Sequence, residues 1–217
     1  MKGDLRILSS RLLLVEGNDE YWFFIQLLQY MGLNQTPETL DVQVIDIEGR
    51  TKFSSSISLL VKHPDFFKVH TVGFVRDAEE NPATASYTSM SSAIKKHLSS
   101  FPIPKMGFVE KSGNNACGIY IMPNNADAGM LEDMCLSSVS SQPLYKHVDN
   151  YVNNAFGLLS AVEQKKYNSH KAKVQTYLAG QVEIVNSLAN AAKKYIWDFS
   201  SPVFSDVTNF VRMIASV

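Results

Sequence analysis

The 217-residue chain has few features that would place it outside the ordinary globular proteins. Its two cysteines, Cys117 and Cys135, lack the CxxC spacing of metal and redox sites, and we expect both to be reduced core thiols. No stretch reaches the roughly 18 apolar residues of a membrane span. Charged residues interrupt the first 15 positions, which predicts no signal peptide. We therefore expect a cytoplasmic protein with no membrane partner.

The sequence also lacks the short motifs that mark the commonest enzyme classes. It has no GxxxxGK or GxGxxG loop for phosphates and no GxSxG motif for a nucleophilic serine. The five histidines share no metal-ligand spacing. The formal net charge of -1 excludes a global basic field, so a nucleic-acid partner would need a local patch.

Short apolar runs that alternate with helical patterns predict the fold. Buried strands are expected at Leu12–Val15, Val42–Ile47 and Val69–Val75, each followed by a helix. Asn18 or Asp19 is expected to cap the first helix and Thr51 the second. Two further strands, Met106–Val109 and Gly118–Met122, are expected to form a hairpin. Beyond them come helical patterns only: Tyr145–Leu159, Gln164–Leu178 and Val182–Trp197.

This alternation predicts an α/β protein with a mostly parallel central sheet flanked by helices, because parallel strands need crossover connections. We expect an α/β domain over residues 1–142 and a helical C-terminal extension, residues 143–217, packed on it.

Acidic side chains follow the predicted strands. Glu16 follows the first, Glu48 the second, and Asp77 and Glu79 the third. Because the carboxyl ends of parallel strands meet at one sheet edge, these acids are expected to lie together. Crowded carboxylates repel one another unless a cation neutralises them, and oxygen ligands suit Mg²⁺ or Mn²⁺. Other acids are expected to be solvated or capping residues: Asp19, Glu20, Glu38 and Glu80.

Lysines dominate the predicted helical tail. Six lysines face one acid, Glu183, between residues 165 and 197. They indicate either a solvated helix face or a local phosphate-contacting patch.

Two of the acid-bearing segments that follow the predicted strands resemble a Toprim domain. The first is Val15-Glu16-Gly17-Asn18-Asp19, and the second is Arg76-Asp77-Ala78-Glu79. Gly129-Met130-Leu131-Glu132-Asp133 resembles a stretch of the stand-alone bacterial Toprim-like proteins, which are related to the nuclease half of the OLD family. The resemblance covers roughly residues 12–136, and Glu79 departs from it because topoisomerases and primases have a second aspartate there.

The resemblance implies Mg²⁺- or Mn²⁺-dependent phosphodiester chemistry on nucleic acid. Asp77 and Glu79 would hold metal, and Glu16 would hold metal or act as general acid or base. Glu132 and Asp133 would complete a second metal site. Lys171 or Lys173 from the tail would stabilise developing negative charge, so both are candidate catalytic residues.

Two other functions remain open at the level of sequence. A Toprim-like scaffold can bind nucleotide, nucleic acid or a partner protein without catalysis. In a phospho-acceptor of the receiver type, Asp77 would be phosphorylated and Lys111 would lie at a later strand end, although Glu16-Gly17 does not supply the acidic pair that receivers need. The sequence leaves the substrate, the number of metals and the oligomeric state open.

Overall fold

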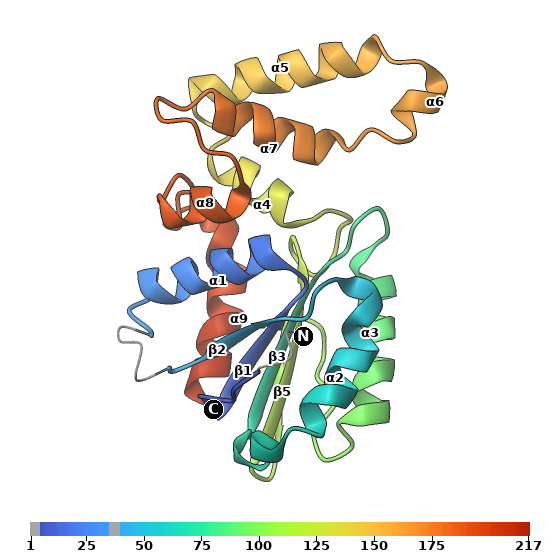
Figure 1. The fold of residues 1–217 in the computed structure, drawn as a ribbon, viewed down its shortest axis with the longest axis vertical. Helices are drawn as coiled ribbons and strands as arrows, with labels where there is room; N and C mark the ends of the chain where they lie inside the picture. Colours follow the sequence, from blue (N-terminus) through green and yellow to red (C-terminus); the bar gives the residue numbers. More distant parts are fainter. Residues whose placement is uncertain (1–4, 35–39) are drawn as a thin grey trace.

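The structure, a computed structural model, describes residues 5–34 and 40–217. These residues form a five-stranded sheet in the order β2-β1-β3-β5-β4 (Figure 1). The first three strands of that order and β5 run parallel, and β4 runs antiparallel to β5. The mostly parallel α/β fold predicted from the sequence is confirmed. The strands are β1 (Arg11–Val15), β2 (Gln43–Asp46), β3 (Thr71–Asp77), β4 (Val109–Ser112) and β5 (Asn115–Met122).

Helices cover both faces of the sheet and continue beyond it. Those connected to the strands are α1 (Asn18–Tyr30), α2 (Phe53–Val61), α3 (Ala83–His97) and α4 (Leu131–Ser138). The C-terminal part adds α5 (Pro143–Gly157), α6 (Ala161–Gln164), α7 (Ser169–Ala179), α8 (Leu188–Lys193) and α9 (Ser205–Ser216). Short 3-10 turns are η1 (Arg50–Lys52), η2 (Pro64–Lys68) and η3 (Pro202–Phe204).

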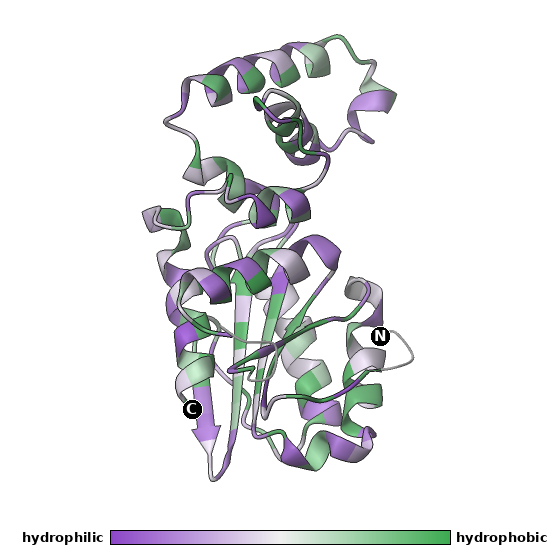
Figure 2. Cartoon of the chain, turned by 60° about the vertical axis from the view of Figure 1, so that its left-hand side comes forward, coloured by the Kyte–Doolittle hydropathy of each residue, from purple (hydrophilic) through white to green (hydrophobic). Residues whose placement is uncertain are grey.

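Alternate residues of each strand pack into two separate cores. Leu12 and Leu14 of β1 face the core that α2 and α3 complete. Leu13 and Val15 face the opposite core, which α1, α4, α8 and α9 complete. Because both faces are covered, the central strands are nearly continuous apolar runs, and Figure 2 shows them mostly in the hydrophobic colour.

The C-terminal helix α9 lies directly against the sheet. Two strand glycines allow this close approach: a Cβ at Gly73 would lie 2.8 Å from Ile214 Cδ1, and one at Gly118 would lie 2.8 Å from Phe210 Cε2. Phe210 and Ile214 are fully buried in this contact. Part of the predicted C-terminal extension therefore covers a face of the α/β sheet.

Helices α5, α6 and α7 form an arm above the carboxyl edge of the sheet (Figure 1). Helices α5 and α7 pack on each other, and α7 also contacts α4. The Tyr177 hydroxyl of α7 donates a hydrogen bond to Gln142 Oε1 at 2.6 Å, and its ring stacks on Trp197 with centroids 5.9 Å apart. Within the described ranges, no helix is long and apolar enough to cross a membrane. The predicted domain boundary at residues 142 and 143 stays a prediction.

Several expected elements have other bounds in the structure. The hairpin is present, but its first strand begins at Val109, and Met106 forms only an isolated bridge with Ile119. The expected helix at Val182–Trp197 is wrong, because only Leu188–Lys193 is helical. Helix α9 was not expected.

The expected helix caps are also wrong. Gly17 and Lys52 occupy the N-cap positions of α1 and α2, and neither helix has a side-chain cap. Asp19 instead caps another helix: its Oδ1 accepts the backbone N–H of Ala189 in α8 at 2.9 Å.

Candidate metal and phosphate site

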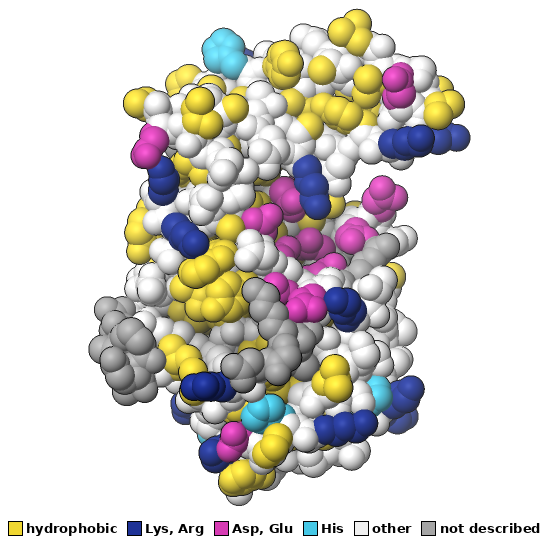
Figure 3. Space-filling model, viewed as in Figure 1, with side chains coloured by type: hydrophobic (Ala, Val, Ile, Leu, Met, Phe, Trp, Pro, Cys, Tyr) yellow, Lys and Arg dark blue, Asp and Glu magenta, His cyan; other side chains and the backbone are white. Residues whose placement is uncertain are grey.

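Seven acidic residues line one cleft at the carboxyl edge of the sheet, and we consider five of them, from four parts of the chain, as metal ligands. Glu16 follows β1, and Glu20 lies in the first turn of α1. Asp77 ends β3, Glu79 follows it in the next loop, and Glu132 lies in the first turn of α4. The cleft has a volume of about 600 Å³. Figure 3 shows these acidic side chains gathered in a hollow below the arm.

Backbone hydrogen bonds fix the loop that carries two of these acids. Asp77 Oδ1 accepts the N–H of Leu131, the first residue of α4, at 3.1 Å. Glu79 has a left-handed φ of 60° and pairs with Gly129 through two backbone hydrogen bonds of 2.8 and 2.7 Å. A non-glycine residue adopts this conformation only where its surroundings enforce it. The loops after β3 and before α4 are thus tied together at the cleft.

Glu16 lies beside an arginine at the floor of the cleft. The distance from Arg76 Nε to Glu16 Oε2 is 3.7 Å, and the two side chains are 14% and 17% exposed. Attraction between such shielded charges is stronger than at a surface, but it must offset the desolvation of both groups. Arg76 therefore holds Glu16 at the cleft and cancels part of the acidic charge there.

Burial and mutual repulsion raise the pKa values of the acids deepest in the cleft. Burial, assisted by the charges of Glu16 and Glu132, raises the pKa of Glu20 from 4.5 to about 7. The pKa of Asp77 lies well above its usual 3.8, first because of burial and then because of the charges of Glu20 and Glu132. Burial also raises the pKa of Glu132, although Lys171 opposes this rise. The cleft therefore favours protons or a cation among its carboxylates.

Lys171 brings a cation from the arm to the acids. It lies in the first turn of α7 and lines the cleft opposite the sheet edge. Asn168, which caps α7, accepts the backbone N–H of Lys171 at 2.9 Å and lines the cleft as well. Figure 3 shows a Lys or Arg side chain directly above the acidic hollow. The arm thus places one ammonium group where negative charge accumulates.

Two predicted site residues lie outside the cleft, as does Glu48, which was expected to lie with the other acids and lines a neighbouring cavity. Lys173 is directed to α5, where its Nζ lies 2.6 Å from Asp149 Oδ1. Asp133 accepts the N–H of Met130 at 2.8 Å through one oxygen and pairs with His170 through the other. Neither Lys173 nor Asp133 lines the cleft. Local partners engage both side chains, and their expected roles as catalytic lysine and metal ligand stay predictions.

The position of Lys111 does not fit the receiver-type alternative. Lys111 on β4 pairs in register with Ala116, which in turn pairs with Thr71 at the start of β3. Asp77 is the last residue of that strand. Six residues of extended chain separate the two positions, or roughly 20 Å at about 3.3 Å per residue. Lys111 cannot contact a phosphoryl group on Asp77.

Sequence reasoning missed three residues of the cleft. Glu20 and Asp19 were expected to be solvated or capping residues, and Asn168 was not considered; all three line the cleft. Glu80, also expected to be solvated, is exposed at the cleft rim. Glu38 lies outside the described residues. Glu20 follows Glu16 by four positions at a strand-to-helix turn, and this spacing was the signal that could have identified it.

The donor chemistry of the cleft fits a hard divalent cation. Mg²⁺ and Mn²⁺ prefer carboxylate oxygens, and the cleft offers several whose charges are otherwise poorly compensated. Among the residues that the structure describes, no three acidic, histidine or cysteine side chains already surround a single point as metal ligands. Ligation would require rotation of the glutamate side chains.

Comparison with known proteins identifies the family. A family model described as "Protein of unknown function (DUF3226)" matches residues 10–216. The chain belongs to this family. It is also similar to a solved structure, the C-terminal region of the OLD protein of Xanthomonas campestris pv. campestris. The sequence identity is 11%, the TM-score is 0.49, and the match covers 97% of this chain and 98% of the other. A similarity of this degree assigns no residue a role. No curated protein matches the chain.

Proposed function

We propose that this protein binds one or two Mg²⁺ or Mn²⁺ ions in the acidic cleft and cleaves phosphodiester bonds in nucleic acid. The observation that carries the proposal is the convergence of the five carboxylates, at least three of them with raised pKa values, at one sheet edge. The Toprim resemblance of the segments around Glu16 and Asp77 supports the same chemistry.

The proposed roles follow from position in the cleft. Asp77 and Glu79 hold metal, since they leave the same strand end and line the cleft together. Glu16 holds metal or moves a proton as general acid or base. Glu132 and Glu20 supply carboxylates for a second ion. When bound, the cation would neutralise the scissile phosphate and lower the pKa of a water ligand.

Lys171 acts on the phosphate from the other wall of the cleft. Its ammonium group would stabilise the negative charge that develops on the phosphate oxygens during cleavage. Its charge also opposes the rise in the pKa of Glu132. We assign Lys173 no role in this step, since it does not line the cleft and pairs with Asp149.

The charge of the cleft imposes an order on binding. Phosphates are anionic, and the acidic side chains that line the cleft outnumber Lys171, so the cleft repels a phosphate that arrives without a cation. A cation must therefore occupy the cleft before a phosphodiester can bind there. Nucleic acid should bind the cleft with metal present and fail to do so in EDTA.

The decisive experiment is a cleavage assay on single-stranded and duplex DNA and RNA in Mn²⁺, Mg²⁺ or EDTA. The wild type should cleave only with metal. Glu16→Gln and Asp77→Asn each keep the side-chain shape but remove the charge, and each should lose on the order of 10²-fold or more in rate.

Glu183→Gln is the matched control, because the Glu183 side chain is 80% exposed and lies outside the cleft. It should cleave at the wild-type rate. A folded wild type that binds metal yet cleaves none of these substrates would contradict the catalytic part of the proposal and favour a non-catalytic binding module.

A further inference from the structure

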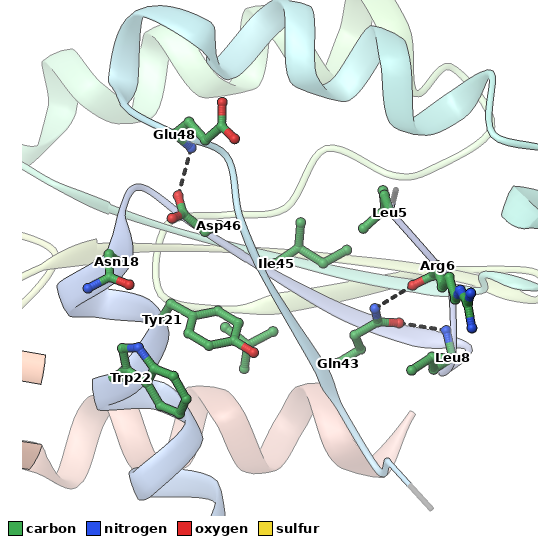
Figure 4. A pocket seen from close by; sticks show the side chains of 11 residues that line it. Leu5, Arg6, Leu8, Asn18, Tyr21, Trp22, Gln43, Ile45, Asp46 and Glu48 are labelled. Carbon is green, nitrogen blue, oxygen red and sulfur yellow. Dashed lines mark hydrogen bonds between the residues drawn. The ribbon is translucent and has the colours of Figure 1, made fainter. Parts of the chain in front are cut away.

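A second cavity adjoins the acidic cleft on the side of the edge strand β2. Its volume is about 490 Å³, and Tyr21 and Trp22 of α1 and residues 43–46 of β2 line it. Asn18 lines both this cavity and the acidic cleft, so the two hollows share a rim. Figure 4 shows Tyr21 and Trp22 beside each other on α1, facing β2 across the cavity.

The two aromatic side chains form an angled wall. Their ring centroids lie 5.1 Å apart and their planes meet at 88°. A flat ring that stacks on one of them would meet the other edge to face, which is a favoured aromatic geometry. Both side chains are only half-buried, whereas the next two residues, Phe23 and Phe24, are fully buried in the core. Part of each side chain of this wall is therefore accessible outside the core.

Charged and polar groups surround this wall. Lys193 of α8 covers one face of the Trp22 ring, with Nζ 3.4 Å from the ring centroid. Asp46 lines the cavity and accepts the backbone N–H of Glu48 at 2.7 Å, which fixes the direction of its carboxylate. A carboxylate has about four acceptor sites, so Asp46 can also accept from an amino group or a ring N–H of a base.

Gln43 has a structural role in the cavity. Its side-chain amide donates to the carbonyl of Arg6 at 2.7 Å and accepts the N–H of Leu8 at 2.7 Å. Figure 4 shows both hydrogen bonds at the end of the cavity remote from Asn18. Gln43 thus shapes one end of the cavity, while Asn18, Asp46 and the aromatic wall remain to contact a ligand.

We infer that this cavity binds an unpaired nucleobase of a single-stranded nucleic acid whose neighbouring phosphate occupies the acidic cleft. This inference rests on the proposed function and specifies its substrate. The shared rim at Asn18 places base and phosphate sites side by side, as adjacent parts of one strand require. A base inside a duplex is stacked on its neighbours and cannot enter, so unpaired nucleotides are preferred.

The test compares a fluorescent oligothymidylate of about 12 nucleotides with an abasic strand of equal length. Binding is measured by anisotropy in Ca²⁺, which also prefers oxygen ligands. Both strands carry the same phosphates, and only one carries bases. The wild type should bind the oligothymidylate about 5-fold to 100-fold more tightly, as expected for stacking of one base.

Trp22→Leu and Tyr21→Leu should each reduce this preference, and Trp22→Phe should retain most of it because a ring remains. The control is Phe67→Leu: Phe67 is 81% exposed in η2, which leads into the opposite end of β3. It should leave the preference unchanged. Melting temperatures within a few degrees of wild type identify the variants that can be compared.

Three outcomes would overturn the inference. Equal binding of the two strands by the wild type would exclude a base site, while metal-dependent binding of both would leave the proposed function intact. An equal loss for both strands in Trp22→Leu would assign Trp22 a structural role. Binding of neither strand, with metal bound, would contradict both the base site and the proposed function.

Discussion

Replacement of Glu20 by glutamine should stabilise the metal-free protein at pH 8 much more than at pH 5. Glu20 lies in the acidic cleft, where burial and the charges of Glu16 and Glu132 raise its pKa from 4.5 to about 7. Between these two values the folded protein retains a proton that the unfolded chain has lost. Stability therefore falls as the pH rises through this window.

The size of this effect follows from the pKa difference. One pKa unit corresponds to about 1.4 kcal/mol, so the full window amounts to about 3 kcal/mol in the free energy of unfolding. Between pH 5 and pH 8 the loss is about 2 to 3 kcal/mol, because part of the window lies below pH 5. Glutamine cannot titrate and should remove this loss.

Urea unfolding followed by circular dichroism, in EDTA at pH 5 and pH 8, measures the difference directly. The quantity of interest is the change in unfolding free energy between the two pH values, compared between wild type and Glu20→Gln. Glu183→Gln replaces an exposed carboxylate and should behave like the wild type. The reasoning is refuted if Glu20→Gln loses as much stability as the wild type between pH 5 and pH 8.

Replacement of Lys171 should reduce cleavage, whereas replacement of Lys173 should reduce only stability. Lys171→Ala should slow metal-dependent cleavage on the order of 10²-fold and flatten the salt dependence of nucleic-acid binding, because Lys171 lines the cleft. Lys173→Ala should leave cleavage within about 2-fold and lower stability by up to about 1 kcal/mol in a thermal melt, because it loses only the pair with Asp149. If Lys171→Ala and Lys173→Ala slow cleavage equally, Lys173 also acts in catalysis.

The sheet was predictable because its strands are buried on both faces. Runs such as Leu12–Val15 leave no polar face to solvent, and the structure buries these four side chains almost completely. The acid-bearing ends of these strands then meet at one edge, since β1, β2 and β3 run parallel. The placement of Glu16, Asp77 and Glu79 in one cleft thus follows from the local pattern and the parallel strands, whereas the strand order was not predicted.

The C-terminal helices were predicted less well. Val182–Trp197 reads as a helix, but Ser187 caps a helix of only six residues, and Tyr195 takes a left-handed φ of 53° after it ends. Helix α9 was overlooked although Val207, Phe210, Val211 and Ile214 recur at helical spacing and are all fully buried. The signal for α9 was present in the sequence, whereas the break before α8 depends on tertiary contacts.

Side-chain partners were the least predictable feature of the site. Lys171 and Lys173 are two residues apart, and only the position of α5 directs Lys173 to Asp149 and away from the acids. Asp133 follows Glu132, yet its oxygens are engaged by Met130 and His170. Such assignments depend on how α7 packs on α5 and α4, and sequence spacing contains no information about those contacts.

The central claim is that the acidic cleft binds a divalent cation, and calorimetric titration of the metal-free protein with Mn²⁺ tests it most directly. The account predicts binding of one or two ions per chain, with an affinity at least about 10-fold weaker in Asp77→Asn, which loses a ligand, and unchanged in Glu183→Gln. No binding by the folded wild type at millimolar Mn²⁺, or equal affinity in wild type and Asp77→Asn, would contradict it.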